Sequence, residues 1–244
     1  MTKNEIKQVK QLQQKKYRQQ QGLFVVEGWK SIQDYLQTGM KPEKIYAVET
    51  ATVPSGANDQ VSFISQKVLQ QISGLKHPKD ALAIFKQPVY KHLPQSGLIL
   101  VLDNLQDPGN LGTIIRTADW FGIQNIVCSM GTVDCYNPKV VQASMGSLAH
   151  VQVYYTDLTA YLPKLNLPVY GTFLKGNNLY REQLPEAAAI VIGNEGQGIS
   201  SEIAALVTHK ITIPKALGSR AESLNASVAT AIIVNEFKRK LFLK

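Results

Sequence analysis

The sequence predicts an α/β protein in which a small α/β domain precedes a doubly wound parallel sheet. Strand-like and helix-like apolar patterns alternate along most of the 244 residues, which is the order expected of βαβ units. Residues 98–103 form an apolar run without alternation, as expected of a parallel strand that is buried on both faces. These two observations place the parallel sheet in the second part of the chain.

The small domain is predicted at residues 1–88. Its strand-like runs are short and apolar, and they lie at 24–28, 44–48, 61–64 and 81–85. A helix pattern at 29–36 separates the first two runs, and Ser65 is an N-cap candidate for a second helix. A polar stretch that carries prolines and a glycine then predicts a linker at 89–97.

The larger domain is predicted at residues 98–244. Its strand-like runs lie at 98–103, 125–129, 151–155, 169–173, 188–192 and 210–213. Helix patterns cover 113–121, 139–148 and 224–240, and a further helix begins near Ser200. The last helix carries Ile232, Ile233 and Phe237 at helical spacing, which predicts that this apolar face is buried.

The charge of the chain favours a polyanionic partner. The formal net charge is +8 and the pI is near 9.3. Residues 1–21 hold six basic residues against only Glu5, namely Lys3, Lys7, Lys10, Lys15, Lys16 and Arg18. Phosphate contacts need positive charge but little fixed geometry, so this polar arm, which has a helix-like pattern, is a candidate nucleic-acid contact. A solvated helix face without a partner is the alternative.

Composition and spacing argue against several other classes of protein. No run approaches the roughly 18 apolar residues of a membrane span, and the first residues lack the apolar core of a secretory signal. Cys128 and Cys135 make neither a disulfide framework nor a CxxC pair, and the histidines lack metal-ligand spacing. We therefore expect a cytoplasmic protein without a metal ion and without a membrane partner.

The first of three polar motifs follows the apolar run at 98–103. Asp107-Pro108-Gly109-Asn110 has the composition of a turn, and open α/β sheets bind ligands just beyond the carboxyl ends of their strands. Asn110 and Arg116 are six residues apart, so they face one site only if Asn110 lies in the loop before the helix. The spacing alone leaves open whether Arg116 is a site residue or a surface arginine.

The second and third motifs follow later strands. Gly193-Asn194-Glu195-Gly196-Gln197-Gly198 has glycines that let a backbone approach a flat ligand, but it lacks P-loop and Rossmann spacing. Glu195 is therefore either a site residue or an ordinary loop carboxylate. Ser223-Leu224-Asn225 opens the last predicted helix, where Ser223 can be an N-cap and a site residue at once.

Together, and in this order, the motifs resemble those of the SpoU (TrmH-like) branch of the SPOUT RNA methyltransferases, the 2′-O-ribose methylating enzymes. Residues 98–240 resemble the catalytic domain of that family, including the segment 139–148, and the segment 16–28 resembles its accessory substrate-binding domain. The resemblance implies a ribosomal-protein-like α/β fold for the first domain and a deep trefoil knot in the second. It also implies a homodimer that completes each site, and we predict that the apolar face of the last helix with Ile232, Ile233 and Phe237 forms a contact of that dimer.

The resemblance assigns roles to five catalytic residues. Arg116 matches the essential arginine of the family, and because a guanidinium keeps its proton, phosphate positioning and charge stabilisation suit it better than base catalysis. Asn110 and Asn225 would orient Arg116 and the ribose. Glu195 would orient its neighbours or accept a proton, and Ser223 would hold its loop.

S-adenosyl-L-methionine (AdoMet) is the methyl donor that the resemblance implies. Its contacts would be made by Thr172, Gly193, Gly196, Ile213 and Leu224. The segment 215–221 is longer than the corresponding loop of the family, which touches the cofactor.

The implied activity is transfer of the AdoMet methyl group to a ribose 2′-hydroxyl, and the accessory domain favours rRNA over tRNA as the substrate. Three alternatives remain open: a tRNA methyltransferase, a non-catalytic RNA-binding or ribosome-assembly protein, and a small-molecule enzyme of the doubly wound class. The intact motifs count against the second alternative. The basic arm and the missing dinucleotide and P-loop fingerprints count against the third.

Overall fold

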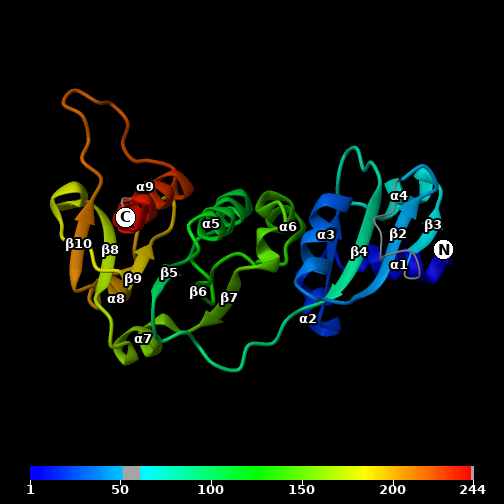
Figure 1. Cartoon of the computed structure of the whole chain (residues 1–244), viewed down its shortest axis with the longest axis horizontal. Coiled ribbons are helices and arrows are strands. Elements are labelled where there is room, and N and C mark those ends of the chain that lie inside the picture. The colour runs from blue at the N-terminus through cyan, green and yellow to red at the C-terminus, as the bar shows by residue number, and fades with distance from the viewer. Residues whose placement is uncertain (52–60, 243–244) are drawn as a thin grey trace. The chain divides into compact units, whose positions relative to one another are not determined.

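A computed structural model describes residues 1–51 and 61–242, and these residues divide into two units. The first unit comprises residues 1–89 and 134–150, and the second comprises residues 90–133 and 151–244. Figure 1 labels most of the helices and strands of both units. No helix within the described residues is long and apolar enough to cross a membrane.

The first unit is built on a mixed four-stranded sheet with the order β1-β4-β2-β3, in which only the β2–β3 pair is parallel. Its elements are α1 (Lys3–Gln11), α2 (Lys15–Gln21), β1 (Leu23–Glu27), α3 (Trp29–Gln37), β2 (Pro42–Val48), β3 (Val61–Ile64), α4 (Gln66–Ile72), β4 (Ala81–Lys86), α6 (Pro138–Ser144) and a 3-10 helix (Ser147–Ala149). The predicted strands are confirmed. Ser65 caps α4 as predicted, because its side chain accepts a hydrogen bond from the Val68 amide.

Apolar side chains cover both faces of this sheet. Val25 of β1 packs with residues of α1 and α4 on one face. Its neighbour Phe24 points to the other face, where its ring lies 5.6 Å from Tyr35 of α3 and 4.6 Å from Tyr136. Residues 134–150 therefore supply part of the core of the first unit, although the sequence predicts a helix at 139–148 within the larger domain.

Arg18 anchors this returning segment and is not part of the exposed arm. Its guanidinium, 1% exposed, donates hydrogen bonds to the Asp134 carboxylate at 2.6 and 3.1 Å and to the Leu12 carbonyl at 2.9 Å. The prediction of Arg18 as an RNA contact is therefore wrong, because a buried and paired guanidinium is not available to phosphate. Lys10, Lys15 and Lys16 are exposed, as the prediction requires.

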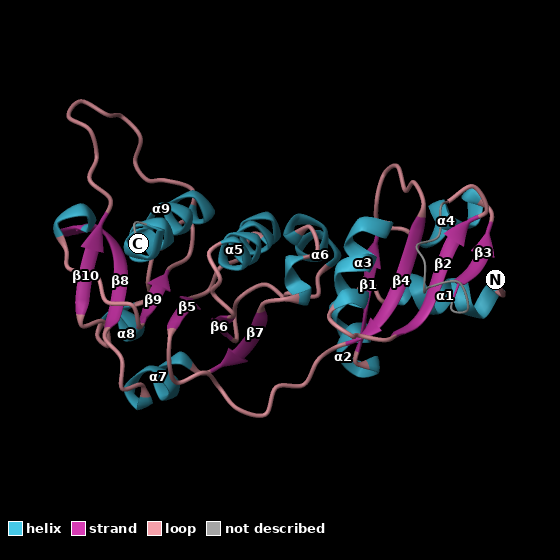
Figure 2. Ribbon diagram, in the orientation of Figure 1, coloured by secondary structure: helices cyan, strands magenta, loops and turns pink. Residues whose placement is uncertain are grey.

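The second unit is an all-parallel sheet with the strand order β10-β8-β9-β5-β6-β7 (Figure 2). Its elements are β5 (Leu98–Leu102), α5 (Pro108–Trp120), β6 (Asn125–Ser129), β7 (Gln152–Thr156), α7 (Leu158–Tyr161), β8 (Val169–Asn178), β9 (Ala188–Ile192), α8 (Ser201–Ala204), β10 (His209–Thr212) and α9 (Ala226–Lys238), with short 3-10 helices at Leu162–Lys164, Leu179–Arg181 and Arg239–Phe242. The predicted α/β class and parallel sheet are confirmed.

The helices cover both faces of this sheet, as a doubly wound fold requires. Val169 of β8 packs with α7 and α8 on one face. The next residue, Tyr170, points to the other face, where its ring meets Phe237 of α9 edge-on at 5.1 Å. The five residues of β5 are all buried, which explains why this strand carries no polar alternation.

The chain order creates a topological switch point between β5 and β9. The chain leaves β5 toward β6 on one side of the sheet, whereas it leaves β9 toward β10 on the other side. Adjacent parallel strands whose connections diverge leave a crevice beyond their carboxyl ends, where ligands of open α/β sheets bind. The loops after β5 and β9 carry the first and second motifs.

Three helix boundaries differ from the sequence prediction for local reasons. α5 begins at Pro108, because Asp107 caps it by accepting a hydrogen bond from the Asn110 amide at 2.7 Å. α6 ends at Ser144, because Met145 and Gly146 adopt left-handed conformations. α9 begins at Ala226 and its N-cap is Asn225, so the alternative of Ser223 as N-cap is wrong.

The apolar face of α9 that is predicted to form a dimer contact is largely buried by other residues of the same chain. Ile233 and Phe237 are 2% and 5% exposed, and only Ile232 of the predicted trio is partly exposed. The prediction that Ile233 and Phe237 supply a dimer contact is therefore wrong. Their burial follows from the packing of α9 onto β8 and onto α5.

Replacing Arg18 by Gln should destabilise the first unit strongly. Removing one partner of a buried ion pair leaves an uncompensated charge and typically costs about 3–5 kcal/mol. Urea unfolding followed by circular dichroism measures this loss. Lys16→Gln on the same helix α2 is the matched control, because Lys16 is exposed. Equal unfolding midpoints for the two variants would contradict a structural role for Arg18.

Candidate active site

Residues of all three motifs form one hydrogen-bonded cluster at the switch point. Asn110 is 7% exposed on the first turn of α5 and lies at its centre. Its side-chain amide donates to the Glu195 carboxylate at 3.0 Å, and its oxygen accepts from the Asn225 side chain at 2.9 Å. The three side chains come from the loop after β9, from α5 and from the start of α9.

Glu195 also accepts two backbone hydrogen bonds from the loop after β5. The amides of Asp107 and Gln106 donate to its two oxygens at 3.2 and 3.3 Å. Partial desolvation raises the pKa of Glu195, but the bonds from the Asn110 side chain and from backbone amides outweigh it and hold the pKa below its usual range. The carboxylate is therefore ionised and acts as an acceptor.

Asn225 links the cluster to the last helix. Its side-chain oxygen accepts from the Ser227 amide at 2.9 Å, from the Ser227 hydroxyl at 2.6 Å and from the Val228 amide at 3.3 Å. Because this oxygen faces donors, the NH₂ group of Asn225 is directed to Asn110. Ser223 is exposed and lies just before this cap.

Arg116 lies outside the cluster. The two residues could face one site only if Asn110 lay in the loop before the helix. Asn110 is instead on α5 itself, so Asn110 and Arg116 of one chain point in different directions. Six residues separate them by about 9 Å along the axis and about 240° around it. Arg116 is exposed and, among the described residues, has neither a hydrogen-bond nor an ion-pair partner.

The predicted AdoMet contacts lie within β8, in the loop after β9, just after β10 and just before α9. Gly171 of β8 pairs with Val191 of β9, so the next residue, Thr172, lies level with the end of β9. Gly193 is buried in the loop after β9, and Gly196 is exposed at its tip. Ile213, just after β10, is half-buried, and Leu224, just before α9, is 47% exposed.

The glycines in this region fit a ligand that is recognised through the backbone. A Cβ atom at Gly193 would lie 2.1 Å from the Gly198 carbonyl carbon, so only glycine permits the loop to close on itself. At Gly196 the nearest atom would be 3.7 Å away, which leaves its backbone open to a ligand. Among the described residues, no three His, Cys, Asp or Glu side chains gather as a metal site would need.

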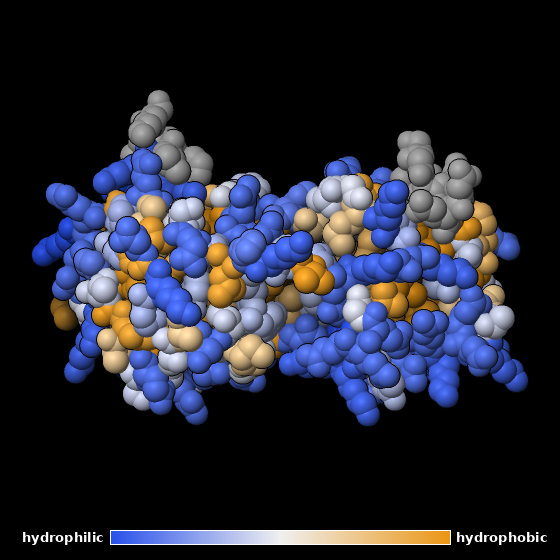
Figure 3. Space-filling view, turned by 90° about the horizontal axis from the view of Figure 1, so that it is seen from below, coloured by the Kyte–Doolittle hydropathy of each residue, from blue (hydrophilic) through white to orange (hydrophobic). Residues whose placement is uncertain are grey.

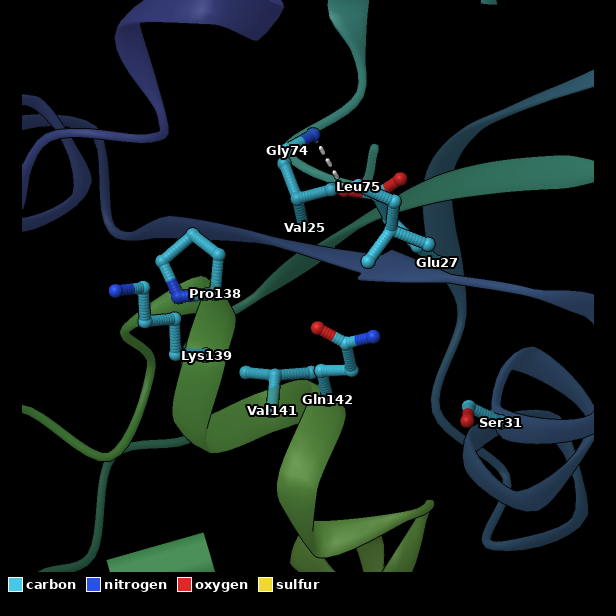
Figure 4. A pocket seen from close by; sticks show the side chains of 9 residues that line it. All are labelled: Val25, Glu27, Ser31, Gly74, Leu75, Pro138, Lys139, Val141 and Gln142. Carbon is cyan, nitrogen blue, oxygen red and sulfur yellow. Dashed lines mark hydrogen bonds between the residues drawn. The ribbon is translucent and has the colours of Figure 1, made fainter. Parts of the chain in front are cut away.

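A small pocket in the first unit lies apart from these residues. It is bordered by β1, α3, the loop after α4, and α6, and Figure 4 shows its lining side chains, among them Glu27 and Gln142. Burial raises the pKa of Glu27, although hydrogen bonds from Ser73 and Gly74 oppose that rise. None of the residues predicted for catalysis or for AdoMet lines this pocket.

The positive charge of the chain is concentrated in its first part. Residues 1–89 contain 13 basic and 7 acidic residues. Lys10, Lys15 and Lys16 are exposed on α1 and α2. Hydrophilic residues cover much of the face drawn in Figure 3, where apolar residues form separate small patches.

Sequence reasoning missed the backbone amides of Gln106 and Asp107 as partners of Glu195. Motif reading considers side chains, and a backbone donor has no residue signature. The Asp-Pro pair at 107–108 carries a usable signal, because Asp is a preferred N-cap and Pro a preferred first helical residue. That signal predicts a helix start at Pro108, and hence the burial of Asn110.

Two family models cover most of the chain. The SpoU rRNA methylase family matches residues 97–235, and the MRM3-like substrate-binding domain matches residues 3–83. The first match spans more than half of the chain and includes all the residues predicted for the site.

Characterised relatives and solved structures agree with these matches. The chain is 32% identical to the 23S rRNA (guanosine(2553)-2′-O)-methyltransferase RlmP of Bacillus subtilis over 94% of both proteins. A TrmH-family structure from Porphyromonas gingivalis shares 39% identity over 98% of this chain and 99% of its own, with a TM-score of 0.88. An AdoMet-bound rRNA methyltransferase from Sinorhizobium meliloti shares 28% identity over 99% of this chain and 96% of its own, with a TM-score of 0.87. The chain therefore belongs to the SpoU family of AdoMet-dependent RNA 2′-O-ribose methyltransferases.

Proposed function

We propose that the chain methylates a ribose 2′-hydroxyl of 23S ribosomal RNA, with Asn110, Arg116, Glu195, Ser223 and Asn225 as its catalytic residues. The observation that carries this proposal is the Glu195–Asn110–Asn225 cluster, which joins all three motifs at the switch point of the sheet. The similarity to RlmP over 94% of both chains favours rRNA over tRNA. The cytoplasmic location expected from the sequence is part of the same proposal.

The cluster fixes the geometry of the site. AdoMet, when bound, supplies an activated methyl group. The proposed contacts for it are Thr172 of β8 and the loop residues Gly193, Gly196, Ile213 and Leu224. Glu195 is held ionised by its amide donors. In this proposal it orients Asn110, and its ionised form is the one that can accept a proton. Ser223 is exposed beside the Asn225 cap, where it can hold the loop before α9. We also propose that the segment 213–225 follows the knotted path of the family.

Arg116 supplies the positive charge that the reaction needs. A ribose hydroxyl is a weak nucleophile, and the alkoxide that develops in the transition state is stabilised by a nearby cation. The guanidinium cannot act as the base, because it keeps its proton at all relevant pH values. Its planar donors suit a phosphate oxygen and the reacting oxygen together.

A homodimer resolves the separation of Arg116 from the cluster. Arg116 is exposed on α5 and turned away from Asn110. We propose that it completes the site of a second copy. Because the face of α9 with Ile233 and Phe237 is buried, the proposed interface uses the exposed faces of α5 and α9, which include Trp120 at 83% and Val228 at 48% exposure.

The first unit, with its excess of basic residues, is the proposed RNA-binding part of the protein. Lys10, Lys15 and Lys16 are exposed, and among the described residues their side chains have no hydrogen-bond or ion-pair partner. Arg18 is excluded from this surface by its pairing with Asp134.

Mapping of 2′-O-methyl groups tests the proposed function. Purified protein, tritiated AdoMet and unmodified 23S rRNA or total tRNA are incubated, and the labelled nucleotide is identified by primer extension at low nucleotide concentration. Label in 23S rRNA is expected. Label only in tRNA would establish the alternative substrate, and RNA binding without calorimetric AdoMet binding would establish a non-catalytic RNA-binding protein.

Replacing Arg116 by Ala should lower the single-turnover rate far more than it weakens AdoMet binding. Loss of one charged stabilising group typically costs on the order of 100- to 1000-fold in rate, and an effect confined to the transition state appears in kcat. Arg116→Lys should not restore the rate, because an ammonium lacks the planar fork. A rate for Arg116→Ala within about threefold of the wild type would remove Arg116 from the mechanism.

Mixing of two inactive variants tests whether Arg116 acts across the dimer. Arg116→Ala and Glu195→Gln protomers are mixed under conditions that allow exchange. If Arg116 serves its partner's site, one of the two sites in each mixed dimer is intact, and about a quarter of the wild-type rate returns after random exchange. No recovery despite exchange, or a monomeric mass in light scattering, would contradict the proposal.

Replacing Lys10, Lys15 and Lys16 together by Gln should flatten the salt dependence of RNA binding. Each lost phosphate contact reduces the slope of log K against log salt by about 0.7–0.9. AdoMet binding should not change. The matched control replaces three exposed lysines of the second unit, Lys91, Lys164 and Lys240. An equal change of slope in the control would place the RNA contact elsewhere.

Glu195 should make the stability of the protein pH-dependent in the acid range. Its pKa is lowered by the fold, so its bonds stabilise the native state above the unfolded pKa of about 4.3. That contribution is lost as the pH falls through the folded pKa. Melting temperatures of the wild type and Glu195→Gln, compared from neutral pH to about pH 3, should therefore converge in acid. A constant difference would show that Glu195 is not held ionised by the cluster.

A further inference from the structure

We infer that the dipeptide Asp103–Asn104, just after β5, is a clamp that positions Glu195 for methyl transfer by holding the loop 193–200 at both of its ends. The inference rests on the proposed function for its catalytic consequence. The clamp itself rests on contacts within the second unit. Neither residue is among the five that we propose as catalytic residues.

Asp103 holds the end of the loop. It is 2% exposed, and one of its carboxylate oxygens accepts from the Ser200 amide at 2.8 Å and from the Ser200 hydroxyl at 2.7 Å. The other oxygen accepts from the Asn104 side chain at 3.1 Å. Ser200 is the N-cap residue of α8, yet its side chain makes no capping bond, because its hydroxyl is engaged by Asp103.

Asn104 holds the start of the loop. Its φ of +53° is in the left-handed region, which is unfavourable for a residue with a Cβ. Its amide donates to the Ser129 hydroxyl at 2.8 Å, and its carbonyl accepts from the Asn194 side chain at 2.7 Å. This conformation turns the carbonyl toward Asn194, the residue before Glu195.

The loop between these two anchors is closed by its own hydrogen bonds. Asn194 and Gly198 exchange backbone hydrogen bonds at 2.8 and 2.9 Å. The Asn194 side chain accepts from the amides of Gly196 and Gln197 at 2.9 and 3.1 Å. Because the loop is closed by its own hydrogen bonds and held at both ends, Glu195 stays close to its donors, which are the Asn110 side chain and the amides of the loop after β5.

The clamp explains how an exposed carboxylate is kept in one place. Glu195 itself is exposed, and its cluster partners lie on other elements. Asp103 and Asn104 lie on the same segment as Gln106 and Asp107, whose amides bind Glu195. One short segment, 103–107, therefore holds the loop 193–200 and also supplies donors to the Glu195 carboxylate. The loop and these donors cannot shift independently of each other.

A double-mutant cycle with Asp103→Asn and Glu195→Gln tests the inference. Asp103→Asn keeps the side-chain shape but loses the charge that strengthens both Ser200 bonds. We expect a fall of about 10- to 100-fold in the single-turnover rate at saturating RNA and AdoMet, as for a displaced catalytic group. In the Glu195→Gln background the same change should cost little further, because Asp103 acts through Glu195. Additive losses would overturn the inference.

Hydrogen exchange measured by mass spectrometry supplies a readout that does not depend on activity. Asp103→Asn and Ser200→Ala should raise exchange selectively in the peptide that contains 193–200. Asp157→Asn is the matched control, since Asp157 accepts from the Thr159 amide at a helix start without touching this loop. Unchanged exchange in the loop, or a rise throughout the second unit, would overturn the clamp. If the wild type is inactive in methylation but the two variants still show selective exchange in the loop, the clamp stands and the proposed function is refuted.

Discussion

The side-chain amide of Asn110 has one donor group and one acceptor group, and a different motif engages each of them. Glu195 can only accept when ionised, so the NH₂ group of Asn110 must face it. The oxygen is then left for the Asn225 side chain, whose own oxygen is left for the amides at the start of α9. The negative charge of Glu195 thus determines which group donates and which accepts in the chain of side-chain hydrogen bonds from Glu195 through Asn110 to Asn225.

The parallel sheet makes this arrangement possible. Glu195 is 85 positions from Asn110, and Asn110 is 115 positions from Asn225. The pairing of β5 with β9 brings the first two to neighbouring strand ends, and the packing of α9 beside α5 brings the third. Because the chain connections diverge at this point, the carboxyl ends of β5 and β9 lie where ligands of open α/β sheets bind. The fold therefore positions the site without any sequence-local contact between its parts.

The sequence was sufficient for the strands, because each is a short apolar run whose burial can be read from composition. It also located the cluster residues, since the motifs place polar side chains after strands. It was insufficient where burial depends on distant partners. Arg18 resembles its lysine neighbours until Asp134, 116 positions away, is folded against it. Likewise, Phe237 is an apolar helix residue whose partner, Tyr170, lies on a strand far along the chain. Periodicity identifies an apolar helix face, but it does not identify the element that packs against that face.

The separation of Arg116 from Glu195 has a physical advantage. A guanidinium within reach of an ionised carboxylate forms a bidentate ion pair that satisfies both groups and leaves less positive field for any third group. In this chain the carboxylate is instead satisfied by amides, which carry no net charge, and the guanidinium stays exposed on α5. In the proposed reaction, its full charge would then be available to a phosphate or to a developing alkoxide. A site that binds an anion while holding its own anion benefits from this separation. In the proposed homodimer, the second protomer would return the cation when the site is assembled.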